Sequence, residues 1–165
     1  MALAGELLCR HRPQFAASDA AALAALSGGS VGRALELADA GGVELYRSLG
    51  ELLAQAPAID VGRLHALTDR LARADAEGAY HACEALLVQF LARLAGDAAR
   101  GHAGGEEIVA GEAAAMRRLA GAADPARWAG LRAEIEANFV AARELNLDKK
   151  QTVLGAFFAI EAMAR

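Results

Sequence analysis

Residues 26–37 read Leu26-Ser27-Gly28-Gly29-Ser30-Val31-Gly32-Arg33-Ala34-Leu35-Glu36-Leu37. The two adjacent glycines, Gly28 and Gly29, allow the left-handed backbone that ends a helix at little steric cost. Ser30 is then a good N-cap for a second helix, because its hydroxyl accepts a hydrogen bond from an amide of the next turn. The stretch therefore predicts one short helix, a glycine break and the start of a new helix.

Arg33 is the candidate functional residue of this stretch. It falls at the third position of the new helix, where a cation is disfavoured by about 0.3–1 kcal/mol beside the positive end of the helix dipole. A capping box would place Glu or Gln there. We therefore expect Arg33 either to pair with Glu36 one turn later or to be the relic of a contact with an anion such as a phosphate. Gly32 leaves room for such an approach, and together with Ser30 it completes the candidate site.

The composition indicates an all-α fold. Hydrophobic residues make up 55% of the 165 residues, much of it alanine, and aromatic residues make up 5%. Ala, Leu, Glu and Arg favour helices, whereas the Val, Ile and Thr that favour strands are sparse. We expect a helical bundle preceded by a few short helices.

The charge and the cysteines narrow the class of protein further. The formal net charge is -4 and no run of Lys and Arg occurs, so no direct nucleic-acid contact is expected. Cys9 and Cys83 lie far apart in the sequence and are expected to be reduced thiols of a cytoplasmic protein. No apolar stretch approaches the roughly 20 residues of a membrane span, and no signal peptide is recognisable.

Apolar periodicity and capping residues predict the helices. A fragment from Leu3 to Cys9 begins without a capping residue, so we expect a further portion of protein upstream of it. Ser18 or Asp19 should cap a helix that ends at Leu26, and the arginine helix should end near Ala40. About six helices are expected after Val43, enough for a compact bundle.

The expected helices of the bundle run from Val43 to before Pro57, from Asp60 to Leu71, from Asp75 to before Gly96, from Glu106 to about Ala120, from Asp124-Pro125 to Leu145, and from Asp148 to the end. Residues 96–105 are expected to form a mobile loop, and Gln151 stands at the reciprocal capping-box position relative to Asp148. The expected buried stripes comprise Val43, Tyr46, Leu49, Leu52, Leu53, Val61, Leu64, Leu67 or Thr68, Leu71, Tyr80, Cys83, Leu87, Phe90, Leu91, Leu94, Ile108 or Val109, Met116, Leu119, Trp128, Leu131, Ile135, Phe139, Ala142, Leu145, Val153, Leu154, Phe157, Ile160 and Phe158.

A family resemblance is carried by three segments. Residues 29–35, Gly-Ser-Val-Gly-Arg-Ala-Leu, resemble the sensor-2 region in the lid of AAA+ clamp-loader subunits, in particular the delta-prime subunit family of bacterial DNA polymerase III. Residues 144–151, Glu-Leu-Asn-Leu-Asp-Lys-Lys-Gln, resemble the closing segment of that family, and residues 42–46 resemble the entry to its bundle. Val31 departs from the pattern, since many relatives have proline there. The resemblance covers nearly the whole chain.

The resemblance implies two domains and a non-catalytic role. Residues 1–41 would be the remnant of the lid, and residues 42–165 would be the C-terminal collar domain. Collar domains of the five clamp-loader subunits associate into a ring, so the implied partners are the gamma/tau and delta subunits, and the implied process is loading of the sliding clamp in DNA replication. Docking would leave some bundle leucines exposed as a patch, such as Leu45 or Leu86.

No catalytic, cofactor or metal site is expected. In ATP-binding members of the family the sensor-2 arginine reaches the nucleotide phosphates, but this chain has no Gly-x-x-x-x-Gly-Lys-Ser/Thr loop opposite Arg33. The resemblance also implies that delta-prime subunits do not hydrolyse ATP. The four histidines (His11, His65, His81 and His102) form no zinc-ligand spacing with the cysteines. No set of nucleophile, base and oxyanion donors can be assembled either.

Alternatives remain for two features. Lys149 and Lys150 are expected on a solvated face, and pairing with an acidic partner helix is the other interpretation. The whole chain could instead be a fragment of a gamma/tau subunit, which would give Arg33 a nucleotide role. It could also be a stand-alone helical dimerisation or ligand-binding domain, which would enclose an apolar pocket and self-associate.

Overall fold

The computed structural model describes residues 5, 7, 8, 10, 15–101 and 107–165, and these ranges contain eight helices and no strand. The helices are α2 (Ala17–Leu26), α3 (Val31–Asp39), α4 (Gly42–Leu53), α5 (Val61–Leu71), α6 (Glu77–Ala99), α7 (Glu112–Ala120), α8 (Pro125–Glu144) and α9 (Lys149–Met163). The expected all-α fold and the six helices of the bundle, α4 to α9, are confirmed.

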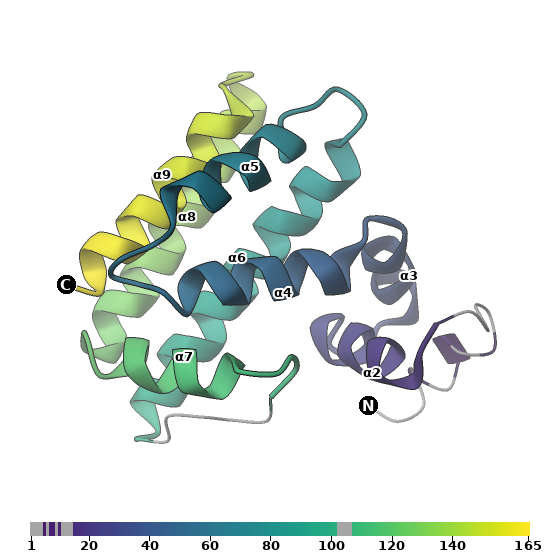
Figure 1. Cartoon of the computed structure of the whole chain (residues 1–165), viewed down its shortest axis with the longest axis horizontal. Coiled ribbons are helices and arrows are strands. Elements are labelled where there is room, and N and C mark those ends of the chain that lie inside the picture. Colours follow the sequence, from purple (N-terminus) through teal and green to yellow (C-terminus); the bar gives the residue numbers. More distant parts are fainter. Residues whose placement is uncertain (1–4, 6, 9, 11–14, 102–106) are drawn as a thin grey trace.

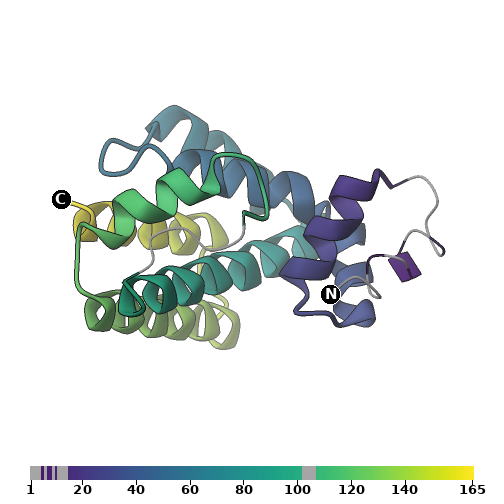
Figure 2. The same ribbon diagram turned by 90° about the horizontal axis from the view of Figure 1, so that it is seen from below.

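Two long helices form the centre of the bundle. α6 and α8 run antiparallel and share the most extensive helix contact in the molecule. α4 crosses α6, α7 packs beside the end of α6, and α5 packs on α9, which in turn packs on α8 (Figure 1). α2 and α3 lie at one end of the molecule, against the start of α4 (Figures 1 and 2).

Four of the predicted helix caps form as expected. The side chains of Ser30, Asp60, Asp124 and Asp148 accept hydrogen bonds from the backbone amides of Arg33, Arg63, Arg127 and Gln151, at 3.4, 3.0, 3.0 and 2.9 Å respectively. Gly28 and Gly29 have φ angles of 61° and 84°, so the glycine break has the left-handed backbone that the sequence predicts. These local signals therefore place the starts of α3, α5, α8 and α9 correctly.

Several predicted boundaries are wrong. α2 begins at Ala17 without a side-chain cap, and Asp19 instead pairs with Arg47 at 2.7 Å. α6 begins at Glu77 rather than Asp75, and it continues through Gly96 to Ala99, where the sequence predicts a loop. α7 begins at Glu112 rather than Glu106. At α7 the Glu107 carboxylate accepts from the amides of Gly111 and Ala113, at 3.1 and 3.0 Å, and so caps the helix at its observed start.

The core confirms most of the predicted buried stripes, with three exceptions that lie near helix ends or on outer faces. Val61, Phe158 and Leu145 are 47%, 43% and 69% exposed. Conversely Leu45 and Leu86, which docking was expected to leave exposed, are only 4% and 0% exposed. Both leucines belong to the internal core, so the predicted exposed patch is not formed by them.

The junction between residues 41 and 42 is a tight turn. Gly41 has a φ of 67°, and a Cβ atom at Gly42 would lie only 2.8 Å from the carbonyl oxygen of Leu37. The apolar core is continuous across the turn, since Leu23, Leu26 and Leu37 join the same cluster as the bundle residues. The division into a domain of residues 1–41 and a domain of residues 42–165 stays a prediction.

Some expectations concern residues outside the described ranges. They are the start of the fragment from Leu3 to Cys9, the positions of Cys9, His11, His102 and Glu106, and the part of the expected loop at residues 102–106.

Candidate functional site

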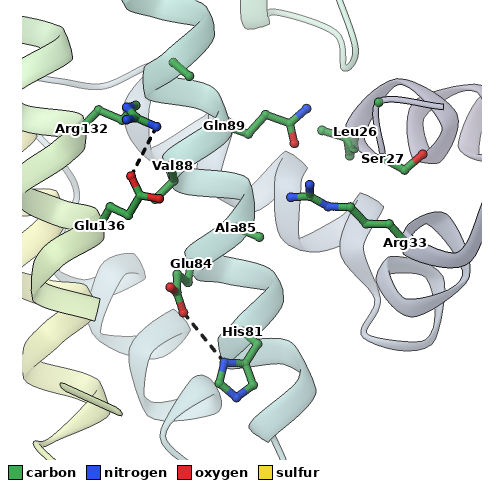
Figure 3. Close-up of a pocket in the computed structure, with 12 residues that line it drawn as sticks. Leu26, Ser27, Arg33, His81, Glu84, Ala85, Val88, Gln89, Arg132 and Glu136 are labelled. Carbon is green, nitrogen blue, oxygen red and sulfur yellow. Dashed lines mark ion pairs between the residues drawn. The ribbon is translucent and has the colours of Figure 1, made fainter. Parts of the chain in front are cut away.

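A groove crosses the outer face of α6 and contains the predicted site residue Arg33. Its floor is α6, one wall is the turn between α2 and α3, and the other wall is α8 (Figure 3). The groove has a volume of about 530 Å³ and opens to solvent. This volume lies in the range of ordinary ligand sites, roughly 300–1,000 Å³.

The three predicted site residues are brought together at the start of α3. Ser30 caps the helix, and its hydroxyl oxygen accepts from the Arg33 amide. The Gly32 position is open, with no other atom of the described chain within 4 Å of where a Cβ would lie. Gly32 therefore shows no close backbone approach in the described part of the chain.

The Arg33 side chain reaches from α3 toward α6 and into the groove (Figure 3). Within the described ranges it has no ion pair, and the pair with Glu36 that the sequence left open does not form. A guanidinium is always charged and strongly prefers a carboxylate or phosphate partner. Arg33 is thus positioned to meet an anion in the groove.

The other charges of the groove are neutralised within the protein. Glu136 pairs with Arg132 at 3.3 Å, both on α8. Glu84 pairs with Arg143, and the Nδ1 atom of His81 lies 3.8 Å from the same carboxylate (Figure 3). The groove therefore offers one guanidinium, that of Arg33, with no compensating carboxylate among the described residues.

The floor of the groove combines an apolar strip with one unpaired acceptor. Ala85, Val88 and Ala92 follow one another at helical spacing along α6. Gln89 lies on the same face, and its side-chain oxygen is buried without a hydrogen-bond partner in the described structure. An unsatisfied buried acceptor costs about 1–3 kcal/mol, so a donor from a bound molecule would be favoured there.

A second polar cluster lies inside the bundle and was not predicted. Glu112, only 3% exposed, accepts hydrogen bonds from the Tyr46 hydroxyl, from Arg93 and, at 2.8 Å, from the Ile108 amide. Arg93 also donates to the Tyr46 hydroxyl at 2.8 Å. Each polar group of α4, α6 and α7 in this cluster has a partner, so the cluster fixes α7 to the bundle and leaves no group directed at a ligand.

Burial raises the pKa values of Tyr46 and Cys83 in the interior. The pKa of the Tyr46 hydroxyl is raised above its usual value, mainly because burial disfavours the phenolate, and also because it donates to Glu112. Burial raises the pKa of the Cys83 thiol to about 12, with the nearby Glu84 charge adding to the effect. Cys83 is therefore a protonated core residue at neutral pH, unsuited to act as a nucleophile.

The two lysines at the start of α9 fit neither of the expected interpretations. Lys149 pairs with Glu77 and lies 5.3 Å from the centre of the Tyr80 ring. Lys150 pairs with Asp69 of α5. The acidic partners come from within the chain, and both pairs hold the start of α9 against its neighbours.

Sequence reasoning missed Gln89, Glu112 and Arg93. For Glu112 and Arg93 a signal existed, because a buried tyrosine such as Tyr46 needs a partner for its hydroxyl. For Gln89 no signal existed, since an exposed-face glutamine of a long helix is unremarkable until its neighbours are known. The described residues hold no cluster of three or more His, Cys, Asp or Glu that could bind a metal ion.

Comparison with known proteins gives no relative. No protein-family model, no curated protein and no solved structure matches this chain. Within the described ranges, no helix combines the length and the apolar character that crossing a membrane requires. The case for a function therefore rests on the residues and on the geometry above.

Proposed function

We propose that the chain is a non-catalytic assembly module of the bacterial replicative clamp loader, corresponding to the end of the lid and the collar domain of the delta-prime subunit. Its partners would be the gamma/tau and delta subunits, which it would help to hold together for loading of the sliding clamp. It would make no direct contact with nucleic acid and perform no reaction. It would work in the cytoplasm as part of the DNA polymerase III holoenzyme.

The main support is the order of elements from residue 26 to residue 163. A short helix ends at two left-handed glycines, Ser30 caps a helix with Arg33 in its first turn, and a six-helix bundle follows a glycine turn. This is the order that the resemblance to clamp-loader subunits implies. The paired charges and the fully partnered interior cluster are also in keeping with a structural role.

The docking surface needs exposed apolar side chains, and the internal positions of Leu45 and Leu86 mean that they cannot supply it. Val61 on α5 and Phe158 on α9 are the better candidates. Asp69 pairs with Lys150 where α5 and α9 meet, and Val61 and Phe158 each lie about two helical turns from that pair, toward the same end of the two helices. The two exposed side chains therefore lie toward the same end of the α5–α9 pair.

Sedimentation velocity would test the proposal. The chain would be mixed with the gamma/tau and delta subunits of the same organism, and a faster-sedimenting complex is expected. The double variant Val61→Asp, Phe158→Asp should weaken the complex at least tenfold, because it places charges in an apolar contact. Val140→Asp, at an apolar position of α8 that is 37% exposed, is the matched control and should leave the complex intact.

The same experiment separates the alternatives. A stand-alone dimerisation domain would sediment as a dimer without the partner subunits, and it would not bind them when they are added. A gamma/tau fragment would associate with delta and also with a delta-prime subunit supplied separately. Failure to associate with any subunit would overturn the proposal.

A further inference from the structure

We propose that the groove on the outer face of α6 is a binding site for a short acidic peptide segment. The Arg33 guanidinium would receive the carboxylate, the Gln89 side-chain oxygen would accept a peptide N–H, and the apolar strip of α6 would contact the neighbouring side chains. The inference does not depend on the clamp-loader proposal, since it uses only the contents of the groove.

The charge of the ligand follows from the ion pairs around the groove. Glu84 and Glu136 are each paired with an arginine, whereas Arg33 has no carboxylate partner among the described residues. A ligand with one negative charge beside Arg33 completes the balance. A cationic ligand would face Arg33 with no carboxylate left to receive it.

The unpaired oxygen of Gln89 distinguishes a peptide ligand from a phosphate. The buried Gln89 oxygen can only accept a hydrogen bond, and it has no donor in the described structure. A fully ionised phosphate ester has only acceptor oxygens and would leave the Gln89 oxygen unsatisfied. A peptide offers an amide N–H and, through Asp or Glu, a carboxylate on the same short segment.

The shape of the floor is consistent with the same ligand. Ala85 and Ala92 are small, and Val88 between them is partly buried, so the strip is shallow and apolar. Leu26 at the end of α2 borders the same groove but is only 1% exposed. The Gln89 oxygen has almost no accessible surface in the free chain, so the proposal requires the Gln89 side chain to turn toward the groove when the peptide N–H binds.

The test uses two pools of N-acetylated, C-amidated hexapeptides with randomised Ala, Leu and Val flanks. One pool has a fixed central Glu and the other has Gln at that position. The immobilised chain should retain the Glu pool about tenfold more than the Gln pool, because a charge-assisted hydrogen bond is worth about a factor of ten or more at a partly solvated site. Amide shifts of the ¹⁵N-labelled chain should map the binding to Ala85, Val88 and Ala92.

Three variants report on the contacts. Arg33→Gln should abolish the preference for the Glu pool, and Gln89→Met should weaken retention several-fold while the preference remains. Arg127→Gln, an exposed arginine of α8 away from the groove, is the matched control and should behave as the wild type. Because Arg33 and Arg127 are exposed, the wild type, Arg33→Gln and Arg127→Gln should keep the same melting temperature.

Inorganic phosphate and free succinate are then tested as competitors of the bound peptides. Neither should displace the peptides at millimolar concentration, since neither combines a negative charge for Arg33 with an N–H and apolar side chains for the α6 floor. Equal retention of the two pools, retention unchanged by Arg33→Gln, or displacement by phosphate would each overturn the proposal.

Discussion

Two arginines next to α6 are in opposite situations: Arg93 lies in the cluster with Glu112, and Arg33 lies in the groove beside Gln89. In the cluster that α6 forms with α4 and α7, Arg93 donates to the buried Glu112 and to Tyr46, and each polar group of the cluster has a partner. In the groove, Arg33 projects toward α6 without a carboxylate partner in the described structure, and the Gln89 oxygen lacks a donor. The difference teaches that the cluster completes the fold within the chain, whereas the groove keeps a guanidinium and an acceptor without partners among the described residues.

The comparison predicts that substitutions of the buried residues of α6 lower the stability of the fold. Leu86→Ala should lower the free energy of unfolding by about 3 kcal/mol, because it removes a fully buried side chain and leaves a cavity. Urea unfolding followed by circular dichroism measures the change. Val88→Ala on the outer face is the matched control and should cost less than about 1 kcal/mol. Equal losses for the two variants would contradict the distinction between the faces.

Glu112→Ala should have the next largest effect, a loss of about 2–3 kcal/mol. The substitution leaves the Tyr46 hydroxyl, Arg93 and the Ile108 amide without their shared acceptor, and removing one member of a buried pair is costly. The same unfolding measurement applies. Glu36→Ala, an exposed glutamate of α3, should change stability by less than about 0.5 kcal/mol.

The buried Cys83 thiol makes the free energy of unfolding depend on pH. Its pKa is 9.0 in an unfolded chain and about 12 in the fold, so its contribution to stability is fully present below pH 9.0 and is lost as pH rises toward 12. Between these values the wild type should lose about 1.4 kcal/mol per pH unit relative to Cys83→Ala. Parallel pH profiles of the two proteins, from unfolding at each pH, would show that the thiol is not held protonated by burial.

The smallest predicted effect on stability is that of a substitution in the groove. Arg33→Gln should leave the free energy of unfolding within about 0.5 kcal/mol of wild type, since the described structure gives Arg33 no ion pair to lose. A thermal melt with the Arg127→Gln control would check this. A loss comparable to that of Glu112→Ala would mean that Arg33 is a structural residue after all.

The sequence alone predicted the helices well where a capping side chain or a glycine pair acts locally. Ser30, Asp60, Asp124 and Asp148 begin their helices as expected because each cap depends on neighbours three residues away. Predictions failed where distant packing decides. Gly96 reads as a helix end, yet α6 continues past it along α8.

The same limit applies to exposure and to the candidate site. Leu45 and Leu86 lie beside the main apolar stripes of their helices, and only the positions of neighbouring helices show that both are enclosed. Arg33 was singled out from its place in the first turn of a helix. The groove around it joins α3, α6 and α8, and no local pattern reveals that these segments meet.

The central claim, that the chain assembles with clamp-loader subunits and does not act alone, is tested most directly by sedimentation velocity of the chain with the gamma/tau and delta subunits. The account predicts a complex that sediments faster than any component and that is lost in Val61→Asp, Phe158→Asp but retained in Val140→Asp. Independent sedimentation of the chain and both subunits, at concentrations where the subunits bind one another, would contradict it.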